Sequence, residues 1–213
     1  MRSYNSHSSV DILNSIADEI DVTFMTLHLL ALDFRHAPLS LREKVAFAEH
    51  TLPAALGALL ARGAEEAAIL STCNRVELLT TWPTPARSDV GLLAFLSDWH
   101  GFPLLGLEHH FRYLVDEAAA RHVIRVACGL ESLVPGEMQI LGQVKQAVRY
   151  AHEAGAAGGA LRALFKCALR AGRRARRETG IARRPVSISH AAVVLIREHF
   201  GNDLTGRHVL LIG

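Results

Sequence analysis

Residues 67–79 read AAILSTCNRVELL, and in this stretch two apolar runs flank the polar letters STCNR. Each run has the length and apolar character of a buried strand, and the polar interruption indicates that the chain turns there. We therefore predict strands over residues 67–72 and 76–82, joined by a turn. Cys73 lies in that turn, so its thiol can be exposed at one end of a sheet. Free thiols are usually buried, which sets this cysteine apart.

Two interpretations of Cys73 remain open on chemical grounds. An unperturbed thiol with a pKa of about 8.5 is only roughly 3% thiolate at pH 7, and a neighbouring guanidinium such as that of Arg75 would favour the reactive thiolate. Cys73 is then a nucleophile. In the alternative, Cys73 is a half-buried bystander and Arg75 is a surface charge. Cys128 and Cys167 lie within helical stretches among Ala, Val and Leu, so we interpret both as core residues.

The segments around this hairpin extend it into a sheet. Residues 24–32 are typical of a buried strand, 39–63 and 89–100 of helices, and 111–115 of a short strand, after which Asp116 is a candidate cap for a long amphipathic helix. The first six elements follow the order β-α-β-β-α-β of the ferredoxin-like split βαβ unit, an antiparallel sheet with helices on one face. The predicted fold class is therefore α+β.

Additional helices are predicted after the sheet, over residues 137–154 and 160–179, with an Ala/Gly-rich turn between them. Beyond Arg183-Arg184-Pro185, a helix over 187–200 and a buried strand over 208–212 predict the truncated start of a Rossmann-like α/β domain, because a parallel strand needs neighbours on both sides. The chain thus divides into a disordered leader, a main domain, a connecting helix with its linker, and the beginning of a second domain: 1–22, 23–158, 159–184 and 185–213.

The composition limits the class of protein. The chain has 213 residues, half of them apolar, and a formal charge of +2, which is too close to neutral to indicate nucleic-acid binding by itself. Residues 1–22 do not resemble a signal peptide, and no apolar run is long enough for a membrane span. Three widely spaced cysteines favour a reducing, cytoplasmic setting, and the scattered histidines predict no metal site.

A second polar cluster falls in GLESLVPGEMQILGQ, residues 129–143. Ser132 and Glu137 flank a helix junction, and Gln139 and Gln143 are four residues apart and so share a helix face. A carboxylate, two amides and a hydroxyl can bind the ammonium and carboxylate groups of an amino acid. The alternative is ordinary helix capping, because an acidic residue is favoured in the first turn by the helix dipole.

A third feature is the basic run RAGRRARR, residues 170–177, on a predicted helix. Such a run can contact RNA phosphates. A solvated helix face is the alternative. Whether this run belongs to an RNA-binding module therefore stays open at this point.

Several stretches together resemble the glutamyl-tRNA reductase family. The resemblance covers nearly all of the chain after Met25, and the pieces that carry it are LREKVAF (41–47), LSTCNRVEL (70–78), RHVIRVACGLESLVPGEMQILGQVKQA (121–147) and HVLLIG (208–213). The resemblance implies NADPH-dependent reduction of glutamyl-tRNA to glutamate-1-semialdehyde through a cysteine thioester, the first step of five-carbon tetrapyrrole biosynthesis. Residues 23–158 would then be the catalytic, glutamyl-tRNA-binding domain.

The resemblance also assigns roles to residues. It makes Cys73 the nucleophile, with Arg75 suited to the substrate carboxylate and Glu137 to its ammonium group. The residues that it places around the glutamate are Thr72, Asn74, Arg75, Ser132, Glu137, Met138, Gln139 and Gln143. Gly213 would be the first glycine of the NADPH loop, and most of that site would be absent from residues 185–213. The chain is therefore expected to acylate without reducing.

The partners follow from the same resemblance. They are glutamyl-tRNA, the downstream aminomutase, and a second subunit in a homodimer, whose C-terminal dimerisation helices this chain would lack. The expected location is cytoplasmic, without membrane contact.

Two departures from the family pattern keep an alternative open. Asp33 and Phe34 occupy positions that are usually Asn and His. Leu114 occupies the place of a histidine thought important for activity, for which His109 and His110 lie just upstream as substitutes. The alternative is a non-catalytic paralogue or fragment that binds glutamyl-tRNA or an enzyme partner.

Overall fold

The fold is built on a four-stranded antiparallel sheet. A computed structural model describes residues 25–83, 89–181, 188–208 and 210. The strands are β1 (Met25–Asp33), β2 (Glu66–Thr72), β3 (Arg75–Pro83) and β4 (Arg112–Val115). Their order, β2-β3-β1-β4, with every neighbouring pair antiparallel, is that of the split βαβ unit. The predicted α+β class is confirmed.

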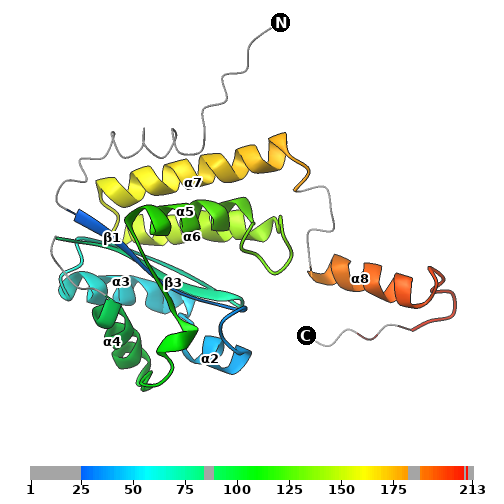
Figure 1. Cartoon of the computed structure of the whole chain (residues 1–213), viewed down its shortest axis with the longest axis horizontal. Helices are drawn as coiled ribbons and strands as arrows, with labels where there is room; N and C mark the ends of the chain where they lie inside the picture. Colours follow the sequence, from blue (N-terminus) through cyan, green and yellow to red (C-terminus); the bar gives the residue numbers. More distant parts are fainter. Residues whose placement is uncertain (1–24, 84–88, 182–187, 209, 211–213) are drawn as a thin grey trace, which may run out of the picture.

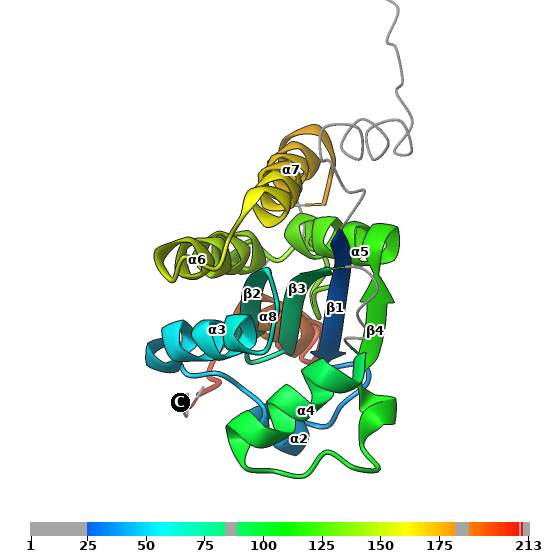
Figure 2. The same cartoon turned by 90° about the vertical axis from the view of Figure 1, so that its left-hand side faces the viewer.

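Helices cover both faces of the sheet, as Figure 2 shows. One layer holds the helices that connect the strands: α2 (Leu39–Lys44), α3 (Leu52–Ala61) and α4 (Asp89–His100). The other layer holds the later helices: α5 (Asp116–Cys128), α6 (Gln139–Glu153) and α7 (Gly159–Glu178). Two short 3₁₀ turns, Glu49–Thr51 and Glu108–His110, complete the connections. The two helices of the split βαβ unit are therefore on one face, as predicted, and the additional helices cover the opposite face.

Alternate residues of β1 explain why both faces are buried. Leu30 and Leu32 pack into the core beneath α3 and α4, whereas Leu29 and Ala31 pack into the core beneath α5, α6 and α7. A strand buried on both faces has a nearly continuous apolar sequence, which is the pattern that predicted β1. The same alternation puts Asp33, Arg75 and Glu77 on the face covered by α5.

The single helix predicted over residues 39–63 is wrong. The chain forms α2, an irregular segment containing the buried Val45 and Phe47, and then α3. Pro53 lies in the first turn of α3, where its missing N–H costs nothing, and it would disrupt the interior of a longer helix. The Phe47 N–H instead donates to the Ser71 hydroxyl at 2.9 Å, which ties this segment to β2.

Three other boundaries differ from the predictions. Asp116 does not cap α5; its carboxylate accepts the Leu27 N–H at 2.9 Å, which joins the start of α5 to β1. Helix α6 begins at Gln139, so Glu137 lies in the preceding loop. His208 and Leu210 belong to no strand, and the rest of the predicted strand over 208–212, like the leader 1–22 and Gly213, lies outside the described residues.

Helix α8 (Ile188–His199) lies apart from the sheet domain (Figure 1). Its exposed apolar side chains include Val193 and Leu195. The start of a Rossmann-like domain over 185–213 stays a prediction.

Glu66, at the start of β2, holds the first turn of α7. Its two buried carboxylate oxygens accept the Ala160 N–H at 3.1 Å and the Leu161 N–H at 2.6 Å. Gly158 allows this approach, because a Cβ there would overlap the same carboxylate. The predicted turn over residues 154–160 is therefore confirmed, and its tip is fixed by a side chain from the sheet.

Replacing Glu66 by alanine should lower the free energy of unfolding by about 1–2 kcal/mol, because two N–H groups at a helix start lose their acceptor. Urea unfolding followed by circular dichroism measures the change. Glu65→Ala, at the neighbouring position, is the matched control and should leave the urea midpoint close to that of the parent chain. Equal midpoints for the two variants would contradict the capping role.

Candidate active site

The turn between β2 and β3 presents Cys73. Thr72 pairs with Arg75, so the turn consists of Cys73 and Asn74 alone. The Thr72 hydroxyl accepts the Asn74 N–H at 3.2 Å, and the Phe34 N–H donates to the Asn74 carbonyl at 3.0 Å. The Cys73 side chain is exposed. The predicted turn cysteine is therefore observed at the end of the sheet, on a backbone held from both sides.

Arg42, on α2, is a site residue that the sequence analysis missed. Its guanidinium donates to the Cys73 carbonyl and lies 3.5 Å from the Asn74 amide oxygen. It belongs to LREKVAF, which was matched to the family but given no role. Because no hydrogen-bonding pattern links residues 31 positions apart in sequence, only the fold reveals that α2 packs beside the turn.

The loop between α5 and α6 brings the second polar cluster to the cysteine. Gly129 ends α5 in the left-handed conformation (φ 78°), and its carbonyl accepts the Gly136 N–H at 3.0 Å. A Cβ on Gly129 would lie 3.1 Å from the Gly136 Cα, so the two glycines allow the loop to close tightly. Ser132 is buried inside this loop, and its hydroxyl has no hydrogen-bond partner among the described residues.

A small cavity of about 20 Å³ lies between this loop and the β2–β3 turn. The predicted site residues that line it are Thr72, Cys73, Asn74, Arg75, Ser132, Glu137, Gln139 and Gln143. Leu133 and Ile140 supply its apolar wall. Its volume matches about one water molecule, so the cavity must widen to admit a larger ligand.

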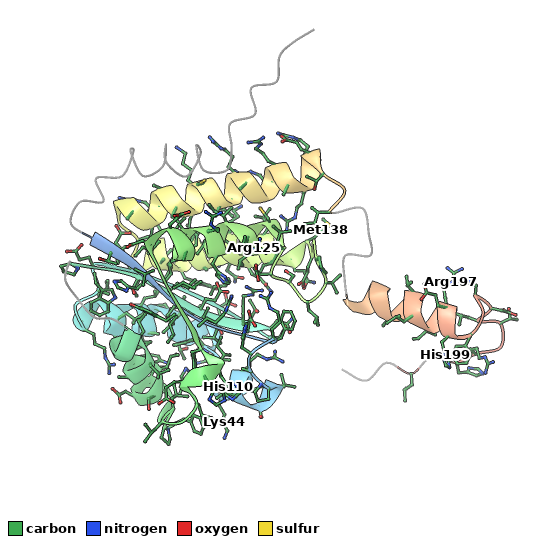
Figure 3. The ribbon with its side chains drawn as sticks, in the orientation of Figure 1. Lys44, His110, Arg125, Met138, Arg197 and His199 are labelled. Atoms are coloured by element: carbon green, nitrogen blue, oxygen red, sulfur yellow. The ribbon has the colours of Figure 1, made fainter. Side chains whose placement is uncertain are left out.

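Met138 is the one predicted glutamate-binding residue outside the cavity lining. Its side chain is 61% exposed on the loop that precedes α6 (Figure 3). The structure therefore brings together all but one of the side chains that the sequence analysis selected for the nucleophile and the glutamate.

Arg75 is buried, with only 1% of its side chain exposed. One guanidinium nitrogen donates to the Glu77 carboxylate at 2.8 Å, and the other donates to the Glu131 carbonyl in the α5–α6 loop. The guanidinium thus connects β3 to the loop that carries Ser132. The interpretation of Arg75 as a surface charge is wrong, because the fold encloses it between the sheet and α5.

Glu77 and its partners continue this charge network under α5. The Glu77 carboxylate also contacts His122 Nε2 at 2.8 Å. Burial alone would raise the pKa of Glu77, but the hydrogen bond and charge of His122, together with Arg75, outweigh burial and lower that pKa. Arg112 lies 3.2 Å from the other His122 ring nitrogen and 3.6 Å from Asp33.

Asp33 and Glu131 are the other two carboxylates of the network, and Arg35 contacts both. Burial by itself would raise the pKa of Asp33, but hydrogen bonds from Arg35 and His36 bring it well below its usual value. The pKa of Glu131 is likewise lowered, because hydrogen bonds from Arg125 and Arg35 exceed the effect of burial. Asp33, which departs from the family pattern, is therefore a fully paired carboxylate at the end of β1.

Acid should destabilise the fold through this network. A carboxyl whose pKa is lowered on folding stabilises the native state above its unfolded pKa of about 4, and loses that contribution as the pH falls through the folded value. Each pKa unit of lowering corresponds to roughly 1.4 kcal/mol. The melting temperature should be nearly constant from pH 7 to 5 and fall below about pH 4.

Asp33→Asn should lower the melting temperature at pH 7 and flatten its fall in acid. Glu43→Gln, at an exposed position, should reproduce the parent curve. An unchanged acid slope in the Asp33 variant would show that this carboxyl does not report on folding.

The histidine substitutes predicted for Leu114 do not line the cavity. Leu114 pairs with Leu29 inside the sheet and lines a separate hollow of about 350 Å³ beside α5. His110 contacts the His36 carbonyl, on the α2 side of the sheet (Figure 3), and its ring lies 4.0 Å from that of His109. The described residues that line the cysteine cavity include no histidine.

The basic run over residues 170–177 divides into parts with different surroundings. Arg174 and Arg177 pair with Glu178, as expected for a solvated helix face. Arg176 turns inward, where it donates to the carbonyls of Ala127 at 2.9 Å and Glu137 at 2.9 Å. Arg173 is exposed beside α6.

Within the described part of the chain, no helix has the length and apolar character needed to cross a membrane. The same residues hold no cluster of three or more side chains suited to a metal ion.

The fold and the site together define a class of protein. This is a split βαβ domain with a second helical layer, in which a hairpin-turn thiol faces a loop rich in hydroxyl, amide and carboxylate groups. Residues 30–179 match the family described as glutamyl-tRNAGlu reductase, N-terminal domain, and the chain belongs to this family.

Individual relatives agree with that assignment. The chain is 42% identical over 190 residues to the glutamyl-tRNA reductase of Geobacillus kaustophilus, covering 89% of this chain and 42% of that relative. It is 44% identical over 190 residues to that of Geobacter sulfurreducens, covering 89% and 44%. The solved structure of glutamyl-tRNA reductase from Methanopyrus kandleri aligns with a TM-score of 0.63 and 32% identity over 81% of this chain and 39% of that one. The chain thus spans less than half the length of these relatives.

Proposed function

We propose that this chain carries the acyl-transfer site of a glutamyl-tRNA reductase, with Cys73 as the nucleophile. The observation that carries the proposal is the exposed Cys73 thiol beside a cavity lined by Ser132, Glu137, Gln139 and Gln143. Neither Cys128 nor Cys167 lines this cavity, and burial raises the pKa of each thiol. A raised pKa leaves less of the nucleophilic thiolate at neutral pH.

The proposed step exchanges an ester for a thioester. The Cys73 thiolate attacks the carbonyl carbon that joins glutamate to the tRNA 3′ end, and the resulting tetrahedral intermediate expels the ribose oxygen, which takes a proton. Free tRNA leaves, and the glutamyl group remains on Sγ. A thioester keeps an electrophilic carbonyl, which is what a later hydride transfer to the aldehyde requires.

The side chains around the cavity suit the glutamyl group. Ser132 offers a buried hydroxyl without a partner among the described residues, and Gln139 and Gln143 offer amides from one face of α6. The Glu137 carboxylate lines the same cavity, and its charge suits the ammonium group. Arg75 lines the same cavity, but because its guanidinium already contacts Glu77 and Glu131, we assign it a positioning role as well as a charge complementary to the substrate carboxylate.

Reduction of the thioester by NADPH is part of the proposed activity of the whole protein. Within the described residues, no strand leads into a glycine-rich turn before a helix, so no residue described here is assigned to the cofactor. For the whole protein we further propose a cytoplasmic homodimer that supplies glutamate-1-semialdehyde to an aminomutase, as the opening step of tetrapyrrole synthesis.

A non-catalytic glutamyl-tRNA binder is the second candidate. It is favoured by the absence of a histidine from the described cavity lining and by Leu114 at the family's histidine position. The exposed thiol counts against it, because binding alone has no need of a nucleophile.

A trapping experiment separates the two candidates. The chain is mixed with tRNA carrying isotopically labelled glutamate, quenched in acid to preserve thioesters, digested, and analysed by mass spectrometry. We expect a labelled glutamyl adduct on the peptide that contains Cys73. Tight binding of the tRNA without an adduct would support the non-catalytic candidate, and an adduct on Cys128 or Cys167 would contradict the assigned nucleophile.

A further inference from the structure

A groove lies between α6 and α7. Both helices belong to the layer on the side of the sheet away from α3 and α4, as Figure 2 shows. The groove has a volume of about 870 Å³ and an apolar floor that includes Val148 and Leu169. Its walls are strongly basic. The cationic side chains that line it are Lys145, Arg149, Arg162, Lys166 and Arg173, with His152 beside them. Glu153 is the acidic residue of the lining.

Most of these cations are exposed and uncompensated. Among the described residues, Arg149 alone of the five has an acidic neighbour, Glu153, at a long 4.0 Å. Lys145, Arg162, Lys166 and Arg173 form no ion pair with the described residues, in contrast to Arg174 and Arg177 on the adjoining face of α7. Residues 162, 166 and 173 recur at intervals of four and seven, so they form one row along α7 that faces the row on α6. Two facing rows of mostly unpaired cations suit a polyanion.

The groove and the Cys73 cavity lie on different sides of α6. Gln143 lines the cavity on one side of α6, while Gly142 and Lys145 line the groove. The two helices meet at this end, because a Cβ on Gly172 would lie 2.8 Å from the Leu141 side chain. Arg173 is therefore at the end of the groove nearest the cavity. From Gln143 to His152, α6 extends for roughly 14 Å, at about 1.5 Å per residue.

We propose that this groove binds the phosphate backbone of the RNA whose aminoacylated end reacts at Cys73. This inference rests on the proposed function, because it uses the Cys73 cavity as the fixed point from which the RNA extends. The cations contact phosphates and give affinity without reading base sequence. The half-buried apolar floor accommodates the sugar and base edges of a strand lying between the two rows. The basic run of α7 thus contributes to binding through Arg173, which faces α6, and not through Arg174 or Arg177.

Neutralising three of the cations that line the groove, one on α6 and two on α7, tests the proposal. The variant is Lys145→Gln/Lys166→Gln/Arg173→Gln in the 213-residue chain. The probe is fluorescently labelled glutamate tRNA that carries no amino acid and therefore cannot acylate Cys73. Each phosphate contact to a single strand contributes about 0.7 to the slope of log affinity against log salt. The slope should therefore fall by about 2, with a loss of affinity of about 100-fold at 0.1 M salt.

The matched control removes the same charge elsewhere. Lys44→Gln/Arg62→Gln/Arg121→Gln lies on other elements, where Lys44 covers the Phe102 ring and the two arginines pair with Asp98 and Glu117. The decrease in salt slope caused by this control variant should be at most half of the decrease caused by the groove variant. Equal losses in the two variants would overturn the proposal, because only net charge would then matter. An unchanged slope in the groove variant would overturn it as well.

A second measurement separates this inference from the proposed function. Transfer of glutamate from its phenyl thioester, which carries no phosphate, is followed by mass spectrometry of the Cys73 peptide. The groove variant should acylate within about 2-fold of the parent chain, whereas Cys73→Ser should bind tRNA normally and fail to acylate. If the parent chain is not acylated, the proposed function is rejected. If salt-dependent binding is at the same time lost only in the groove variant, the RNA-binding role of the groove is retained. A groove variant that loses heparin binding but keeps tRNA binding would assign the groove to another polyanion and overturn the inference.

Discussion

Cys73→Ser should reduce glutamyl transfer from glutamyl-tRNA by roughly 10³-fold or more, because a hydroxyl is a much weaker nucleophile than a thiol at neutral pH. The turn itself should survive, since its hydrogen bonds come from Thr72, Phe34 and Arg42 and involve the backbone or Asn74. Rapid-quench measurement of tRNA release, with the adduct counted by mass spectrometry, gives the rate.

Cys128→Ser and Cys167→Ser provide matched controls for this result. Both thiols lie within helices, and both have a pKa raised by burial. Each variant should release tRNA at close to the parental rate, with any change confined to the melting temperature. A Cys73→Ser protein that still forms a thioester, or a control that loses it, would remove Cys73 from the nucleophile role.

Arg75→Met should lower the free energy of unfolding by about 3–5 kcal/mol, because it leaves the buried Glu77 without its guanidinium partner. The same change releases the Glu131 carbonyl, so the loop carrying Ser132 loses its direct link to β3. Chemical denaturation measures the first effect. Hydrogen exchange of the amides over residues 129–136, which should become faster, measures the second.

Arg75→Lys distinguishes positioning from charge. Lysine keeps the positive charge near Glu77 but cannot donate to Glu77 and the Glu131 carbonyl through a planar fork. We expect most of the stability to return while glutamyl transfer stays weakened. Full recovery of both would show that the charge alone is required, and the positioning role would then be rejected. Arg121→Met, which loses an exposed pair with Glu117, is the control and should change stability by at most about 1 kcal/mol.

The strands of the sheet were predictable from sequence because burial on both faces leaves an apolar run, which is nearly unbroken in β1 and in the 67–70 part of β2. The turn at Cys73 was predictable because polar residues separate two of the strands. The helical stretch over residues 39–63 misled the prediction, since its apolar spacing continues across the break that Pro53 and the buried Phe47 impose. Local patterns record which residues avoid water, but they do not record where one helix stops and another begins.

The role of Arg75 required the fold. Its partner Glu77 is two residues away, but Glu131 is 56 positions further along the chain, and α5 is what encloses all three. Arg42 and Glu66 are similar cases, because each contacts a backbone group in a distant element. Charged residues in sequence are interpreted as surface residues unless a partner is visible, and these partners become visible only once the sheet and its helices are assembled.

Helix α7 is hydrogen-bonded near both of its ends to elements that form the Cys73 cavity. Glu66 holds its first turn to the start of β2, the strand whose other end leads into Cys73. Arg176 holds its last turns to the Glu137 carbonyl, on the opposite wall of the same cavity. Helix α7 has 20 residues and is therefore roughly 30 Å long. Helix α7 therefore links β2 to the loop that carries Glu137, so the two walls of the Cys73 cavity are connected through a single rigid element.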